Sequence, residues 1–391
     1  IAGVGWFIIA CKADRQFITE DIREKKEERD KIVKEYETLI SDLKCLSLTY
    51  DQMRVLDSLE RLIIEDDIAL TKKEDDKALK TEWKNKWEDK LTEGLALVSN
   101  AKAEFFLPET KVISYIEENC EGPWIHLLAM EAMLFSPYYA IFDDGNKDKA
   151  VKKLKCKSKY LTDKFITLQG KFTKTDFVKL QKAYKRAAGI VTGSTKNIVI
   201  GAVRTTAAVA ATGGLAFVFA PVIATALVGE AAAGLSGAAL VSYSLAAIGG
   251  GSLAAGGLGM AGGTAIITGG GALIGMLGGT GISAVTTVSL LSDDDYVLSE
   301  CCKLITFSRE ILIGKYHDSL EVSEIQKKVQ SRMNEVQKQI DTFSSQTENE
   351  KDEKKKKEMK LKAKVAKKSL KYLERTVGEL KKISKTDKSN K

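Results

Sequence analysis

Apolar residues follow three successive patterns along the chain, and each pattern predicts helices. In 14–188 they recur at spacings of three and four between Lys, Glu and Asp, which is typical of amphipathic helices. In 189–292 nearly every residue is small or aliphatic, and in 293–391 the three-four spacing returns with Lys-rich intervals. No segment has the alternation of a strand. We therefore predict an all-α fold with three domains, namely a helical bundle (1–188), a Gly/Ala-rich segment (189–292) and a C-terminal hairpin (293–391).

The C-terminal domain contains two heptad-like seams, separated by the polar stretch 344–352. Alternating intervals of three and four keep one face of a helix apolar, as a coiled coil requires. Two such helices joined by a short polar loop should fold back on each other, so we predict an antiparallel coiled-coil hairpin that ends in a basic tail. The predicted seam consists of Val322, Ile325, Val329, Val336, Ile340, Leu370, Leu373, Val377 and Leu380.

The composition of the middle segment favours membrane helices. It contains most of the chain's 31 glycines, and 231–292 has no Asp, Glu, Lys, Arg or His, which is long enough for two or three crossings of about 20 residues each. Small residues four apart let membrane helices approach closely. The expected packing positions are Gly251, Ala255, Gly259, Gly263, Gly271, Gly275 and Gly279. The alternative is a helical hairpin buried inside a soluble protein, and the scarcity of interfacial aromatic residues keeps it open.

The most aromatic part of the first domain is 109–142, which predicts a core-forming pair of helices. His126 lies in this apolar segment, and we expect a hydrogen-bonded core residue rather than a catalyst. Residues 1–11 form an apolar run that contains Trp6. We interpret the run as an interfacial anchor or the end of a longer membrane helix, or equally as a hydrophobic segment packed against the bundle.

Charge is distributed unevenly along the chain. The net charge is +7, and residues 346–391 alone carry 17 basic and 8 acidic side chains. A basic run such as Lys354–Lys357 binds nucleic acid through counterion release, but no aromatic platform for bases accompanies it. We therefore favour a solvated helix face or anionic lipid headgroups over nucleic acid as its surroundings.

Catalytic and metal-binding motifs are missing from the sequence. The six cysteines and two histidines are scattered without a C-x-x-C pair, which excludes a recognisable zinc motif. The stretch Gly257–Gly262 matches a dinucleotide fingerprint in its letters. It follows no β-branched strand, however, and no acidic residue lies about 20 positions later. We expect no enzyme, no cofactor and no metal ion.

Four stretches, 211–214, 219–221, 233–239 and 249–263, carry a resemblance to known proteins. They resemble the Gly/Ala-rich block shared by interferon-alpha-inducible small membrane proteins and various bacterial membrane-active proteins. The layout of long amphipathic helices around a central apolar segment is also similar to that of α-helical pore-forming toxins. These resemblances imply membrane insertion or permeabilisation, without an active site.

The favoured function is therefore a non-enzymatic, membrane-active protein that forms a pore, as a toxin or a cell-defence effector. A membrane-anchored scaffold whose coiled coil recruits a protein partner is the alternative, and a soluble interaction protein with a buried hairpin is the third. Basic residues flank both edges of the apolar segment, so the positive-inside rule predicts a membrane location with soluble flanks on the cytoplasmic side. A soluble form could precede insertion. The expected partners are the lipid bilayer, further copies of the chain and a protein partner.

Overall fold

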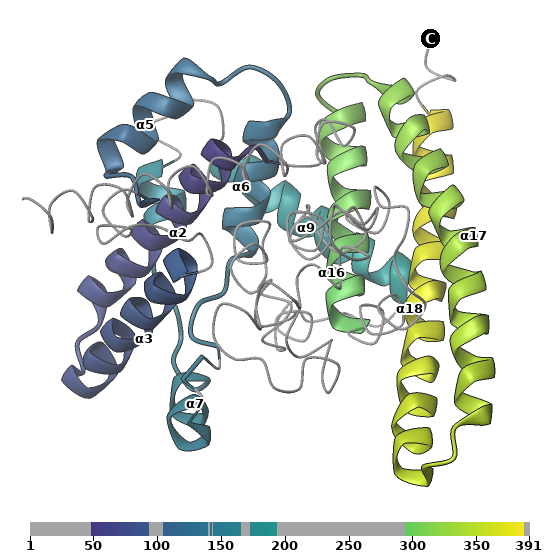
Figure 1. Cartoon of the computed structure of the whole chain (residues 1–391). Helices are drawn as coiled ribbons and strands as arrows, with labels where there is room; N and C mark the ends of the chain where they lie inside the picture. The colour runs from purple at the N-terminus through teal and green to yellow at the C-terminus, as the bar shows by residue number, and fades with distance from the viewer. Residues whose placement is uncertain are drawn as a thin grey trace, which may run out of the picture.

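The computed structural model describes residues 48–93, 105–139, 141–142, 144–165, 173–193 and 294–386 (Figure 1). Within these ranges the structure contains helices and no strand, so the predicted all-α class is confirmed. The helices are α2 (Tyr50–Leu70), α3 (Glu74–Glu93), α5 (Glu109–Glu118), α6 (Trp124–Leu134), α7 (Gly145–Val151), η2 (Leu161–Phe165), α9 (Lys174–Thr192), α16 (Asp294–Thr306), η5 (Phe307–Ile313), α17 (Ser319–Asn349) and α18 (Glu353–Thr386). The elements η2 and η5 are π-helical turns.

Helix α2 begins at a reciprocal cap and packs against α3, α5 and α6. The Thr49 hydroxyl accepts the backbone N–H of Gln52, and the Gln52 side chain accepts that of Thr49, so two N–H groups at the helix start are satisfied. Two fully buried tryptophans of α3, Trp83 and Trp87, stack one helical turn apart. The Trp83 indole donates to the carbonyl of Tyr139 at 2.8 Å, which attaches the segment after α6 to this core.

A second group of helices lies beside the first in Figure 1 and consists of α9, α16, α17 and α18. Helix α9 begins at the capping box of Thr173 and Asp176 and ends at Gly193, whose φ of 69° is left-handed. It packs against α16, and both helices pack against α18. Residues 350–352 join α17 to α18, so the two long helices run antiparallel along their length (Figure 1).

The C-terminal hairpin extends beyond α16. In Figure 1 the upper part of α18 lies near α16, and the loop at 350–352 lies at the bottom, well below the lower end of α16. We call residues 369–384 the anchored half of α18 and residues 353–368 the free half. This division matters because the same helix face is buried in one half and exposed in the other.

The structure corrects the predicted membrane location. Of the helices in the described ranges, none combines the length and the apolar character that a bilayer crossing needs. This finding contradicts the membrane location and the transmembrane character that the sequence suggested. The long helices α17 and α18 illustrate the reason, because charged residues recur throughout them and a charged side chain at the centre of a bilayer is costly.

Several predictions concern residues outside the described ranges. These are the apolar run 1–11 and the packing positions Gly251, Ala255, Gly259, Gly263, Gly271, Gly275 and Gly279. The division into three domains at 188 and 292 also stays a prediction. Helix α9, which begins in the predicted first domain, packs against α16 and α18 of the predicted third domain.

Candidate interaction surface on the C-terminal hairpin

The predicted seam lies at the junction of α17 and α18. Its members lie on these two helices, which pack against each other along their length. All nine side chains are buried: Val322, Ile325, Val329, Val336, Ile340, Leu370, Leu373, Val377 and Leu380. This junction joins the two arms of the hairpin, and it leaves the other faces of α18 for further contacts.

Helix α18 carries a second stripe beside the seam. Its positions are separated by steps of three or four residues, which place them on one helix face. We call this set the second stripe; it consists of Leu361, Val365, Lys368, Tyr372, Thr376, Glu379 and Ile383. The last four are buried, although they belong to the face of α18 that does not contact α17 through the seam.

Three polar contacts fix the anchored half of α18 to the helices beside it. The Thr376 hydroxyl meets the buried thiol of Cys301 in α16. Arg309 of η5 forms an ion pair with the buried carboxylate of Glu379, and Arg375 donates to the carbonyl of Val191 near the end of α9 at 2.8 Å. Elements α16 and η5 therefore contact the second stripe in this half, and α9 contacts the neighbouring Arg375.

The same stripe is uncovered in the free half. Leu361 is 62% exposed, and Val365 is half-buried. An exposed leucine by itself needs no explanation. Leu361, however, continues the face that α16 contacts at Thr376, about four turns further along. The free half therefore presents the edge of a helix-binding face.

A groove follows this part of the hairpin. It encloses about 730 Å³, and the described residues that line it come from the last turns of α17 and from the free half and centre of α18. They are Ser344, Thr347, Glu348, Lys360, Leu361, Ala363, Lys364, Val365, Lys367, Lys368 and Lys371. Between Lys360 and Lys371 the helix rises about 17 Å, which is the length of about three helical turns.

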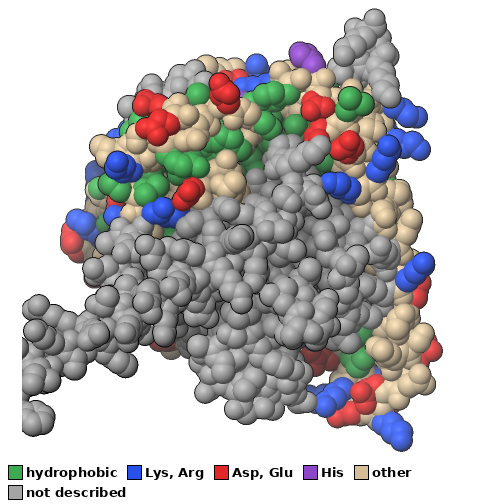
Figure 2. Space-filling model, turned by 45° about the horizontal axis from the view of Figure 1, so that its top comes forward, with side chains coloured by type: hydrophobic (Ala, Val, Ile, Leu, Met, Phe, Trp, Pro, Cys, Tyr) green, Lys and Arg blue, Asp and Glu red, His purple; other side chains and the backbone are tan. Residues whose placement is uncertain are grey.

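The groove is strongly basic at its rim. Five lysines and a single glutamate, Glu348, are among its described lining residues, and all five lysines are exposed. Leu361, Ala363 and Val365 contribute apolar surface between them, and the methylene stems of the lysines add to it. In Figure 2, Lys and Arg side chains project along the right-hand edge of the molecule, the side on which Figure 1 places the hairpin.

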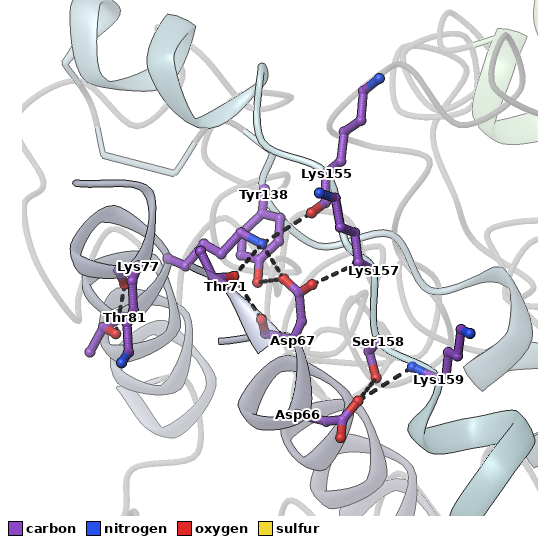
Figure 3. A network of polar contacts seen from close by, with 11 residues as sticks. Asp66, Asp67, Thr71, Lys77, Thr81, Tyr138, Lys155, Lys157, Ser158 and Lys159 are labelled. Atoms are coloured by element: carbon purple, nitrogen blue, oxygen red, sulfur yellow. Dashed lines mark hydrogen bonds and ion pairs between the residues drawn. The ribbon is translucent and has the colours of Figure 1, made fainter. Parts of the chain in front are cut away.

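A buried polar network in the N-terminal helices has a structural role. The carboxylate of Asp67, fully buried in α2, accepts from Lys80 Nζ at 2.5 Å, Tyr138 Oη at 2.6 Å and the backbone N–H of Lys157 at 2.6 Å (Figure 3). Burial and the adjacent Asp67 carboxylate raise the pKa of the Tyr138 hydroxyl. Lys80 Nζ also donates to Thr71 Oγ1 at 3.0 Å and to a backbone carbonyl at 3.1 Å.

This network ties four chain segments together. Asp67 belongs to α2, Lys80 to α3, and the two loops at 135–139 and 155–159 supply the remaining donors (Figure 3). A buried carboxylate is stable when several donors hydrogen-bond to it. Here two of the donors come from the loops, so their hydrogen bonds hold the loops against the helices. The arrangement has no exposed reactive atom, so we interpret it as a structural staple rather than a catalytic site.

A second buried charge cluster joins α6 to α16. Lys303 Nζ lies 3.1 Å from a Glu131 carboxylate oxygen and 2.6 Å from a Glu300 carboxylate oxygen, and all three side chains are buried. Burial raises the pKa of Glu300 to about 7, while the neighbouring carboxylates raise the pKa of Lys303 against the effect of burial. With Glu300 protonated, one lysine faces one carboxylate, which balances the charge.

The remaining candidates from the sequence take structural positions. His126 is buried in α6. Its ring and that of Tyr316 are arranged edge to face, with their centroids 5.7 Å apart. Cys301 and Cys302 are buried in α16, and burial raises the pKa of the Cys301 thiol to about 12, which suppresses the reactive thiolate. In the part of the chain that the structure describes, no cluster of three or more His, Cys, Asp or Glu side chains is placed to hold a metal ion.

Sequence reasoning located the seam and overlooked the second stripe. The stripe has the same three-four spacing as the seam, but its members include Lys368, Thr376 and Glu379, which interrupt an apolar pattern. The available signal was the two residues Leu361 and Val365, which lie outside the seam in an otherwise Lys-rich helix. A search for a second periodic face would have found them.

Comparison with known proteins gives no match: no family model, no curated protein and no solved structure corresponds to this chain. The class of protein that the described structure defines is therefore an all-α protein with a protruding helical hairpin. Its function has to be argued from the hairpin itself.

Proposed function

We propose that the protein is a non-enzymatic interaction protein whose C-terminal hairpin recruits a protein partner through the free half of α18. The supporting observation is the second stripe. Elements α16 and η5 contact it in the anchored half, and Leu361 stands exposed on the same stripe in the free half. A helix face that is covered along part of its length is suited to bind a further helix along the rest.

The hairpin in this proposal is a coiled coil. The alternating three-four spacing of the seam and the burial of its nine members support this geometry, because interlocking side chains at such positions hold two helices at a fixed distance. A coiled coil projects its tip as a stiff rod. It would therefore present the free half of α18 at a constant orientation to a partner.

The pore-forming function that the sequence suggested depends on the Gly/Ala-rich segment, which lies outside the described ranges. It stays a prediction. The recruiting function depends only on described residues, and for that reason we prefer it.

A photo-crosslinking amino acid placed in the full chain tests the proposal in cells. Position 361 reports on the free half, and position 320 is the control, because Leu320 is 72% exposed at the start of α17, at the opposite end of the hairpin. We expect a discrete crosslinked protein at 361 and none at 320. Absence of a product at 361, or the same products at both positions, would contradict the proposal.

A further inference from the structure

We infer that the groove lined by Leu361, Val365 and the lysines of α18 binds an acidic amphipathic helix of the partner. This inference rests on the proposed function and deepens it by stating the chemistry of the bound segment. Two independent observations carry it, the interrupted second stripe and the charge of the groove.

The second stripe indicates which kind of secondary structure fits the groove. In the anchored half, α16 lies against Thr376 through Cys301, and η5 supplies Arg309 to the buried Glu379. The consecutive helical elements α16 and η5 thus contact this face of α18. The free half continues the same face with Leu361 and Val365, so the element that fits there is again a helix with an apolar face.

The charge defines the polar residues of that helix. In the anchored half, the covering element provides a cation to a carboxylate of α18. Along the groove the polarity is reversed, because five lysines and one glutamate are among its described lining residues. Complementary charge then requires Glu or Asp on both flanks of the apolar face of the bound helix.

Nucleic acid fits the groove less well. The described lining residues include no aromatic ring on which a base could stack and no Arg for bidentate phosphate contacts. A phosphate backbone would also leave Leu361 and Val365 without apolar contacts. The lysines with apolar residues between them match a carboxylate-flanked helix better than a polyanion.

The test uses a labelled synthetic peptide of about 16 residues, long enough as a helix to cover the groove. It has leucines on one helical face and glutamates elsewhere. A scrambled peptide of the same composition, without the leucine face, is the first control, and a single-stranded oligonucleotide is the second. Fluorescence anisotropy with the full chain measures binding at low and high salt.

Two double variants of equal charge change separate the groove from the net charge of the helix. Lys364→Glu with Lys367→Glu alters two lining lysines, whereas Lys354→Glu with Lys357→Glu alters two lysines outside the described lining, at the same spacing on the same helix. All four side chains are exposed, so both variants should fold, which circular dichroism checks. Leu361→Ser tests the apolar contact alone.

We expect the amphipathic peptide to bind, with an affinity that falls as salt increases. The groove double variant should weaken binding by about tenfold or more, and Leu361→Ser should weaken it by several-fold, while the control double variant changes it little. The scrambled peptide should bind at least about tenfold more weakly than the amphipathic one.

Four results would overturn the inference: no peptide binding, equal binding of the scrambled peptide or the oligonucleotide, equal losses in the two double variants, or a dimer of the chain that the groove double variant disrupts while the peptide fails to bind. The last result would identify a second copy as the occupant. A crosslinked partner at position 361 without peptide binding would reject the acidic helix and leave the recruiting function intact.

Discussion

The two halves of α18 have the same helical periodicity and opposite surroundings. In the anchored half the helix is buried on two faces, with Leu380 in the seam and Thr376 on the second stripe, both fully buried. In the free half the buried side chains are those of Ala363 and Ala366, and Leu361 is exposed among lysines. The comparison teaches that the same helical periodicity can bury two faces of a helix at one end and one face at the other. Besides α17, the anchored half packs against α9, α16 and η5, and these elements do not extend along the free half.

The largest effect should follow from removing a buried charge in the body that holds the anchored half. Lys303→Met leaves Glu131 and Glu300 buried without their cation, so the free energy of unfolding should fall by about 3–5 kcal/mol. The matched control is Lys362→Met in the free half, where an exposed lysine pairs with Glu358. It should change stability too little to resolve by urea unfolding; equal losses in the two variants would contradict the account.

A leucine in each half offers the next contrast. Leu380→Ala removes a fully buried side chain and should lower the free energy of unfolding by about 2–5 kcal/mol, because a cavity remains in the packed seam. Leu361→Ala on the exposed stripe should stay within about 0.5 kcal/mol of the parent chain. Thermal or denaturant unfolding measures both, and a large loss from Leu361→Ala would show that the free half is already covered.

The protonation of Glu300 predicts how stability depends on pH. Burial raises its pKa to about 7 from an ordinary value of 4.5, so between these values the folded chain holds a proton that the unfolded chain has released. Stability from this group is complete below the unfolded pKa and is lost as the pH rises through the folded one. The loss should be roughly 1–3 kcal/mol between about pH 5 and pH 8.

Glu300→Gln isolates this contribution, because the amide keeps the shape of the side chain and does not titrate. The difference in unfolding free energy between the parent chain and the variant should change across this pH interval. Other carboxylates cancel in the difference. A difference that stays constant between about pH 5 and pH 8 would show that Glu300 is ionised throughout.

Two glycines give the smallest predicted effects, and they differ in sign. Gly193 ends α9 with a left-handed φ of 69°, and an added Cβ would lie 2.9 Å from the guanidinium of Arg375. Gly193→Ala should therefore destabilise the chain by about 1–2 kcal/mol. Gly378 lies within α18 with open space around it, so Gly378→Ala should stabilise by up to about 1 kcal/mol. Unfolding curves that gave the same sign for both would contradict this assignment.

The fold class and the burial of the nine seam residues could be predicted because helical periodicity depends on local sequence. Leucine, valine and isoleucine at three-four intervals mark one face of a helix wherever that helix packs. The same reasoning missed the tryptophan pair of α3, since Trp83 and Trp87 lie in a segment rich in Lys, Glu and Asp. Two large rings one turn apart bury that face in spite of its charged neighbours.

Tertiary relations were beyond the sequence. The contact of Lys303 with Glu131, and that of Asp67 with Lys157, join residues far apart along the chain, and no local pattern announces them. The predicted membrane location was wrong because it did not come from the described helices. It was inferred from composition and from the charges at the segment edges, whereas the described helices lack the apolar length for a crossing.

Amide hydrogen exchange of the full chain tests the difference between the two halves of α18 most directly, because one sample reports on both. The anchored half, residues 369–384, packs against α17 and also against α9 and α16, whereas only Ala363 and Ala366 are buried in the free half. Local opening requires less free energy where fewer contacts break. We predict that amides in 353–366 exchange about tenfold faster or more than those in 369–384. Equal protection along the whole of α18 would contradict the account.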